Sequence, residues 1–335
     1  MCKKRLILTL LIICFVCGIV FVSKPLEAEA SAVSEIAMEL TTETVLKEGN
    51  ADTRLPMAST TKIMTAIIIV EDCNLDEVIT VSDAAVGVEG SSIYLKKDEQ
   101  IDIRDLVYGL MLRSGNDAAC ALAIHHSGSV EKFVEVMNAR AKTVGAESTN
   151  FTNPSGLPDN DHYTTARDLC KIACYAMRNE KFKEVVSTRS HKGNFRSYAN
   201  KNKMLYNYDG ANGVKTGYTV KAGRCLVSSA ERNGMDVVTV VLNCPDMYER
   251  STALLNDAFA NYKLLNLSEN SVFYSGTTLC KLAKSYKIVV RNSENIDYKV
   301  VPLTDNTKIK TGDLAARLEI YDANGLIFNE NLYSI

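Results

Sequence analysis

The segment Ser59-Thr60-Thr61-Lys62 places a hydroxyl and an amine three residues apart, directly before a mostly apolar run over residues 63–70. Such a run predicts a buried helix, and residues three apart lie on one face of a helix. If the helix begins at Ser59, the Lys62 amine reaches the Ser59 oxygen and can remove its proton. Because a serine hydroxyl needs an adjacent base to act as a nucleophile, the spacing predicts a Ser–Lys acyl-transfer pair.

The same spacing occurs a second time, at Ser129 and Lys132, so the pattern alone does not identify a site. A serine after glycine and before a charged turn is typical of a helix N-cap. We therefore interpret the second copy as structural.

Two further patterns follow the first, Ser114-Gly115-Asn116 and Lys215-Thr216-Gly217. Ser-x-Asn and Lys-Thr-Gly each recur elsewhere in the chain. The second Lys-Thr-Gly, Lys310-Thr311-Gly312, has the features of an exposed turn. Ser114 lies between helical stretches, which predicts a helix–helix loop. Lys215 is followed by strand-like segments, which predicts an edge strand of an antiparallel sheet beside a pocket.

In this order the three patterns resemble the signature of penicillin-binding proteins and serine β-lactamases. Longer phrases are similar to the low-molecular-mass penicillin-binding proteins, the serine-type D-alanyl-D-alanine carboxypeptidases; they lie in segments 54–65, 112–119, 156–168 and 213–223. The resemblance runs from about residue 36 to the C-terminus and is dense up to residue 267.

The resemblance implies an α/β fold, a penicillin-recognising (β-lactamase/transpeptidase-like) domain with an antiparallel sheet, helices against it and a helical lobe. We expect residues 250–265 to form a closing helix. After residue 267, short strand-like runs and the hairpin signal Asn324-Gly325 predict a small all-β domain. The expected domains are a signal peptide over 1–30, a catalytic domain over 31–267 and a small β domain over 268–335.

The activity implied by the resemblance is removal of the terminal D-alanine from peptidoglycan stem pentapeptides through an acyl-enzyme, with β-lactam antibiotics as covalent inhibitors. Ser59 would be the nucleophile and Lys62 the base. Ser114 would relay a proton to the leaving amine, and Asn116 would hold the substrate or Lys62. The implied substrate-binding residues are Lys215, Thr216, Gly217, Tyr218 and Arg250. For Arg250, an ordinary charge at a helix start remains the alternative.

Three rival functions share parts of this pattern. A class A β-lactamase needs a glutamate-bearing loop, and residues 150–167 contain no glutamate. A D,D-endopeptidase acting on cross-linked peptidoglycan would use the same residues and stays open. Intact Ser59 and Lys62 argue against a non-catalytic wall-binding protein.

Export is expected from the first 30 residues. A basic start at residues 3–5, an apolar stretch over 6–22 and Ala28-Glu29-Ala30 form the pattern of a secretory signal peptide. The alternative is an uncleaved N-terminal anchor, because the apolar stretch is near the minimum length for a bilayer span. The final residues follow directly on a predicted strand, so membrane attachment is expected only through the N-terminal segment. We therefore expect an extracytoplasmic enzyme.

Composition excludes other classes of function. A formal net charge of −2 without a basic stripe argues against a nucleic-acid partner. The histidines show no ligand spacing with carboxylates or thiols, so no metal or cofactor is expected. His162 is interpreted as a packing residue. The cysteines beyond residue 30 lie in apolar contexts and are interpreted as reduced core residues.

Overall fold

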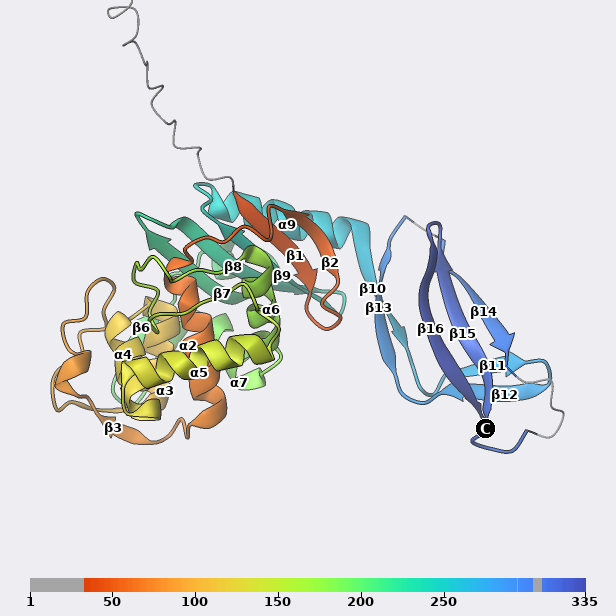
Figure 1. Ribbon diagram of the computed structural model, residues 1–335, viewed down its shortest axis with the longest axis horizontal. Helices are drawn as coiled ribbons and strands as arrows, with labels where there is room; N and C mark the ends of the chain where they lie inside the picture. Colours follow the sequence, from red (N-terminus) through yellow and green to blue (C-terminus); the bar gives the residue numbers. More distant parts are fainter. Residues whose placement is uncertain (1–32, 294, 304–308) are drawn as a thin grey trace, which may run out of the picture. The chain divides into compact units, whose positions relative to one another are not determined.

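The computed structural model describes residues 33–293, 295–303 and 309–335, and the expected signal segment lies outside them. The central element is a five-stranded antiparallel sheet in the order β2-β1-β9-β8-β7 (Figure 1). Its strands are β1 Ser34–Glu39, β2 Val45–Gly49, β7 Ala211–Thr219, β8 Gly223–Arg232 and β9 Met235–Leu242. The strand that carries Lys215 is therefore an edge strand, as the sequence predicted.

Most helices lie between β2 and β7 in the sequence. The longer ones are α2 Lys62–Asp72, α4 Asn116–Ser127, α5 Val130–Thr143, α6 Ala166–Met177, α7 Glu180–Ser187 and α9 Met247–Asn261. The shorter elements are α3 Ile103–Tyr108, α8 Met204–Asn207, a π-helical turn Gly109–Arg113, and 3-10 turns at Ala58–Thr61 and Asp83–Ala85. Two small two-stranded sheets pair β3 Val78–Thr80 with β4 Gln100–Asp102, and β5 Ser190–Lys192 with β6 Ser197–Ala199.

Helices cover both faces of the central sheet (Figure 1). Successive side chains of a strand point to opposite faces, and β9 is apolar on both. Val237 and Val241 pack with Leu254 and Leu255 of α9, whereas Val238 belongs to the larger core that includes α2 and α6. Helix α2 is buried from its first residue to Val70, because it lies inside that larger core. The apolar run after the Ser–Lys pair is thus the centre of the helical lobe.

The closing helix starts and ends earlier in the chain than the sequence predicted. Helix α9 ends at Asn261, and the next residues form β10, Tyr262–Leu267, which pairs antiparallel with β13, Tyr286–Arg291. Backbone pairing in a ladder outweighs the weak helical pattern of this segment. We propose that the small β domain begins at Tyr262 and not after Leu267.

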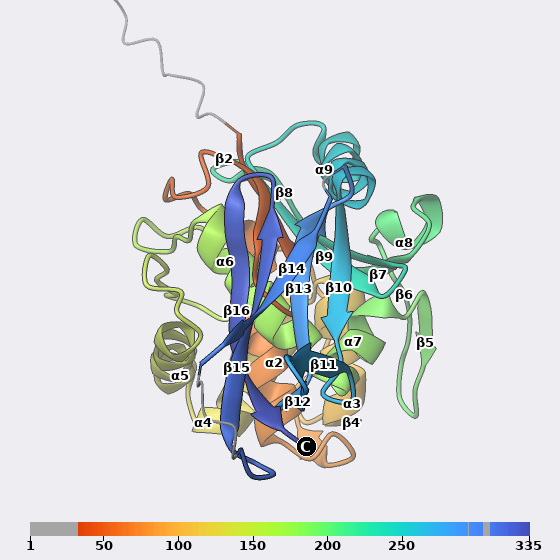
Figure 2. The same cartoon turned by 90° about the vertical axis from the view of Figure 1, so that its right-hand side faces the viewer.

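The remaining strands of the C-terminal region form a second five-stranded sheet in the order β11-β12-β16-β15-β14 (Figure 2). Their bounds are β11 Val272–Ser275, β12 Thr278–Leu282, β14 Asp297–Pro302, β15 Leu314–Asp322 and β16 Gly325–Ser334. The hairpin predicted at Asn324-Gly325 joins β15 to β16. The sheet buries its own apolar cluster, which includes Leu282, Leu318, Ile320 and Leu332.

Candidate active site

Ser59 lies in the 3-10 turn Ala58–Thr61, and α2 begins only at Lys62. The expectation that the helix begins at Ser59 is therefore wrong: the helix begins three residues later, at Lys62. Because a 3-10 helix has about three residues per turn, positions 59 and 62 are eclipsed and their side chains meet. Lys62 Nζ lies 3.0 Å from Ser59 Oγ, within hydrogen-bonding distance.

The Lys62 side chain is fully buried and has two further partners. It donates to Asn116 Oδ1 at 2.7 Å and to the Ser155 carbonyl at 2.5 Å. Burial holds the pKa of Lys62 well below its usual value, and the nearby Lys215 cation lowers it further. A lysine with a strongly lowered pKa is neutral at moderate pH and can accept a proton. The structure thus places an amine with a lowered pKa against the Ser59 hydroxyl.

Asn116, the first residue of α4, connects the lysine to the pocket rim. Its Nδ2 donates to the Glu89 carbonyl at 2.5 Å, and its backbone N–H donates to the Ser91 carbonyl at 2.7 Å. Ser114 follows the π-helical turn with a left-handed backbone (φ 66°), a conformation that is uncommon outside glycine and turns its side chain out of the helix. Ser114 lines the same cavity as Ser59.

On the opposite side of the cavity, β7 carries the Lys-Thr-Gly pattern. The Lys215 side chain is buried, and its Nζ donates to the Thr216 carbonyl at 2.8 Å. Burial, followed by the nearby Lys201 charge, lowers the pKa of Lys215 to about 7. A β-carbon at Gly217 would lie 3.0 Å from the Ser59 backbone nitrogen. Only glycine lets β7 approach the Ser59 turn this closely.

Several of these residues line a cavity of about 470 Å³. It is lined by Ser59, Ser91, Ser114, Lys201, Thr216, Gly217, Tyr218, Arg224, Met247 and Tyr248. Two cationic side chains face the cavity and none of the lining residues is acidic. Such a pocket favours a substrate that carries a negative charge.

Arg250 is an expected site residue whose contacts lie away from this cavity. Its guanidinium pairs with Glu35 of β1 through both Nε and Nη2, and it is not among the lining residues. The charge at this position holds the start of α9 to the sheet. The helix-start alternative therefore describes its surroundings better.

His162 lies behind the Ser59 turn and does not reach Ser59. The Thr152 backbone N–H donates to its Nδ1 at 3.0 Å, so its Nε2 carries the proton and donates to Thr61 Oγ1 at 2.8 Å. Burial lowers the pKa of His162 to about 4. This neutral ring fixes the loop whose Ser155 carbonyl receives Lys62, which is a packing role.

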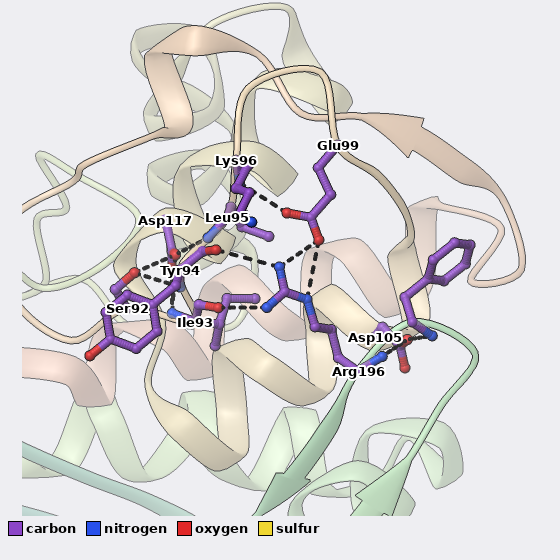
Figure 3. A network of polar contacts seen from close by, with 10 residues as sticks. Ser92, Ile93, Tyr94, Leu95, Lys96, Glu99, Asp105, Asp117 and Arg196 are labelled. Atoms are coloured by element: carbon purple, nitrogen blue, oxygen red, sulfur yellow. Dashed lines mark hydrogen bonds and ion pairs between the residues drawn. The ribbon is translucent and has the colours of Figure 1, made fainter.

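A network of polar contacts fixes the loop that carries Ser91 (Figure 3). The Asp117 carboxylate accepts hydrogen bonds from the backbone N–H groups of Ile93 and Leu95 at 3.0 and 3.1 Å. Arg196 donates to the Ile93 carbonyl at 3.1 Å and pairs with Glu99. Because Asp117 directly follows Asn116, the start of α4 positions both Lys62 and the loop that carries Ser91.

Within the described residues, no group of three or more His, Cys, Asp or Glu could hold a metal ion. In this part of the chain there is also no helix with the length and apolarity to cross a membrane. The cysteines that the structure describes are all unpaired, and Cys170, Cys174, Cys225, Cys244 and Cys280 are buried.

Residues 20–246 match the family model described as D-alanyl-D-alanine carboxypeptidase, peptidase family S11. The chain belongs to this family. It is therefore a serine-type peptidase of the D-alanyl-D-alanine carboxypeptidase family, as the Ser-x-x-Lys, Ser-x-Asn and Lys-Thr-Gly patterns indicated. The fold agrees, with an antiparallel sheet, a helical lobe and a C-terminal all-β region.

Individual family members show the same relationship. D-alanyl-D-alanine carboxypeptidase DacF of Bacillus subtilis is 34% identical over 250 residues, which cover 71% of this chain and 64% of DacF. A D-alanyl-D-alanine carboxypeptidase of a Streptomyces species is 38% identical over 264 residues, or 71% of this chain and 90% of its own length. The match therefore spans slightly less than two thirds of DacF.

Solved structures of family members have the same fold. Penicillin binding protein 5 from Haemophilus influenzae superposes with a TM-score of 0.78 at 27% identity, covering 90% of this chain and 96% of that one. The carboxypeptidase DacD from Francisella tularensis gives a TM-score of 0.75 at 26% identity, covering 90% and 92%. The fold is thus shared along most of the chain.

Several site residues were not predicted from the sequence. The Ser155 carbonyl, Lys201, Arg224 and Tyr248 all contribute to the base or the cavity. The signal for Ser155 was its position beside Gly156-Leu157-Pro158, a phrase that carries the family resemblance. For Lys201 and Arg224, the only sequence signal was a positive charge close to the Lys-Thr-Gly strand.

Proposed function

We propose that this enzyme removes the terminal D-alanine from peptidoglycan stem pentapeptides, with Ser59 as the nucleophile. The observation that carries the proposal is the 3.0 Å contact between Ser59 Oγ and the buried, pKa-lowered Lys62 amine. A Ser–Lys pair of this kind performs acyl transfer.

In the acylation step, Ser59 Oγ attacks the carbonyl carbon of the penultimate D-alanine while its proton passes to Lys62 Nζ. The backbone N–H groups of Ser59 and Tyr218 would receive the developing oxyanion, a type of contact worth about 3 kcal/mol per donor. The C–N bond then breaks, and the leaving D-alanine amine takes a proton through Ser114. The product is an ester on Ser59 and free D-alanine. A water molecule, deprotonated by Lys62 Nζ, then hydrolyses the ester and restores Ser59.

Other residues hold the base and the substrate. Asn116 and the Ser155 carbonyl fix the Lys62 amine toward Ser59. Lys215 and Thr216 would bind the terminal carboxylate, and Gly217 allows the edge strand to approach the nucleophile. The unpaired edge of β7 would align an extended peptide by main-chain hydrogen bonds.

β-Lactam antibiotics are proposed as covalent inhibitors of the same serine. Their strained cyclic amide presents a carbonyl to Ser59, and ring opening leaves the acyl group on the enzyme. Structures that share this fold are described as penicillin binding proteins, which supports the proposal.

Export completes the proposed function. The substrate lies outside the cytoplasmic membrane, and the first 30 residues have the pattern of a secretory signal. We place the enzyme at the cell wall or membrane exterior, with the N-terminal segment as its membrane anchor if that segment stays uncleaved.

A product assay tests the proposal. Purified enzyme is incubated with a stem pentapeptide, with a cross-linked peptide dimer, and with the pentapeptide plus an amine acceptor. We expect D-alanine release from the pentapeptide at the highest rate. Faster cleavage of the dimer would establish the endopeptidase alternative. Faster transfer to the amine would match the solved Streptomyces relative described as a DD-transpeptidase, which is 36% identical.

A further inference from the structure

The cavity holds a cation that the proposed mechanism leaves without a role. Arg224 is the second residue of β8 and lies directly opposite Tyr218 of β7. Its exposed side chain lines the cavity together with Met247 and Tyr248. Its guanidinium makes no hydrogen bond or ion pair with any described residue. The cavity lining contains no carboxylate that could neutralise it.

The expected carboxylate-binding arginine is engaged elsewhere. The Nε and Nη2 groups of Arg250 are both directed to Glu35. Only 9% of the Glu35 side chain is exposed, and a buried carboxylate that loses its partner is costly. Moving Arg250 from Glu35 to a substrate would therefore carry this cost.

Lys215 alone is a weak receptor for a carboxylate at neutral pH. With its pKa near 7, a sizeable share of the amines is uncharged, and the nitrogen already donates to the Thr216 carbonyl. An arginine stays charged at every relevant pH and presents a planar pair of donors that matches a carboxylate. The cavity supplies this chemistry at position 224.

We propose that Arg224 binds the terminal carboxylate of the D-alanyl-D-alanine substrate, in the place expected for Arg250. This inference rests on the proposed carboxypeptidase function. It makes Arg224 a specificity-determining residue, because it distinguishes a free C-terminus from a capped or extended one.

The test compares two substrates that differ only at the end that Arg224 would contact. One is a pentapeptide with a free D-alanyl-D-alanine carboxylate, and the other is the same peptide with a C-terminal amide. The kcat/KM for both is measured with wild type, Arg224→Gln, Arg224→Lys and the matched control Lys221→Gln. Lys221 lies in the same β7–β8 hairpin, but its amine donates a hydrogen bond to Asn160, and its side chain does not line the cavity.

We expect Arg224→Gln to lower kcat/KM for the acid by about 10- to 100-fold, the loss of a charge-assisted hydrogen bond, and to leave the amide unchanged. Arg224→Lys should recover part of the loss, and Lys221→Gln should behave as wild type with both substrates. Equal losses on acid and amide would show a structural role and overturn the proposal, as would no loss on either. Absence of wild-type activity on the acid would instead refute the proposed function itself.

Discussion

Gly217 of β7 lies so close to Ser59 that a β-carbon at position 217 would stand 3.0 Å from the Ser59 backbone nitrogen and 3.2 Å from the Met57 carbonyl oxygen. The glycine therefore sets the spacing between the edge strand and the Ser59 turn. In the proposed oxyanion hole, this spacing would hold the Ser59 and Tyr218 N–H groups together.

Gly217→Ala should slow acylation by about 10²-fold or more, because β7 must move away and misplace one oxyanion donor. Stopped-flow acylation with a reporter penicillin measures the effect, and circular dichroism checks the fold. Gly49→Ala serves as the control, since its new methyl would make only an ordinary 3.4 Å contact with Glu35. Wild-type acylation by Gly217→Ala would contradict the role given to this spacing.

Ser59→Ala should abolish fluorescent penicillin labelling and D-alanine release without unfolding the protein, since one half-buried oxygen contributes little to packing. The matched control is Ser129→Ala in the second Ser-x-x-Lys copy. Ser129 caps α5, where its hydroxyl accepts from the Lys132 backbone N–H. Its loss should cost about 1 kcal/mol of stability and leave labelling intact. Labelling that survives in Ser59→Ala would exclude Ser59 as the nucleophile.

Lys62→Arg should reduce the acylation rate by orders of magnitude, because arginine does not give up its proton at any relevant pH. Lys215→Arg keeps a positive charge where the role is substrate binding, and should retain more activity. Single-turnover acylation of both variants provides the comparison, with melting temperatures to exclude unfolding at either buried site. Equal losses would argue against separate roles for the two lysines.

The pH profile of kcat/KM should have an alkaline limb near 7. Lys215, with a pKa of about 7, is charged below that pH and neutral above it, so its attraction for the substrate carboxylate falls as pH rises. The acidic limb should reflect Lys62, which becomes active as pH rises through its lowered pKa.

Two variants assign the alkaline limb. Lys215→Arg should remove it, because arginine stays charged. Lys201→Gln should move it to higher pH, because the Lys201 charge helps to lower the pKa of Lys215. An unchanged limb in Lys215→Arg would show that another group titrates there.

The parts of the site that the sequence revealed are those set by local geometry. The three-residue spacing of Ser59 and Lys62 determined that their side chains meet, although the turn proved to be 3-10 and not α-helical. The edge position of β7 could be predicted because its sequence contains polar residues and glycines, whereas the strands that follow it are apolar. The N-cap role of Ser129 is confirmed for the same local reason.

The parts that escaped prediction depend on contacts between distant segments. Arg250 and Glu35 are 215 positions apart, so no local pattern indicates that this arginine is already paired. The Ser155 carbonyl comes from an irregular loop. Because every residue has a backbone carbonyl, the residue type at position 155 does not indicate this contact. The early end of α9 reflects the pairing of β10 with β13, a tertiary effect that overrides local propensity.

The burial of Lys62 links chemistry to folding. Its partners come from a 3-10 turn, a helix start and a loop that are distant in sequence, and its lowered pKa depends on exclusion of water. An unfolded chain returns this amine to solvent, where it is protonated at neutral pH and cannot activate a serine. The proposed covalent capture of a penicillin would therefore label only folded molecules. A brief pulse of antibiotic along a denaturant series would read out the folded fraction of this protein directly, even in a crude extract.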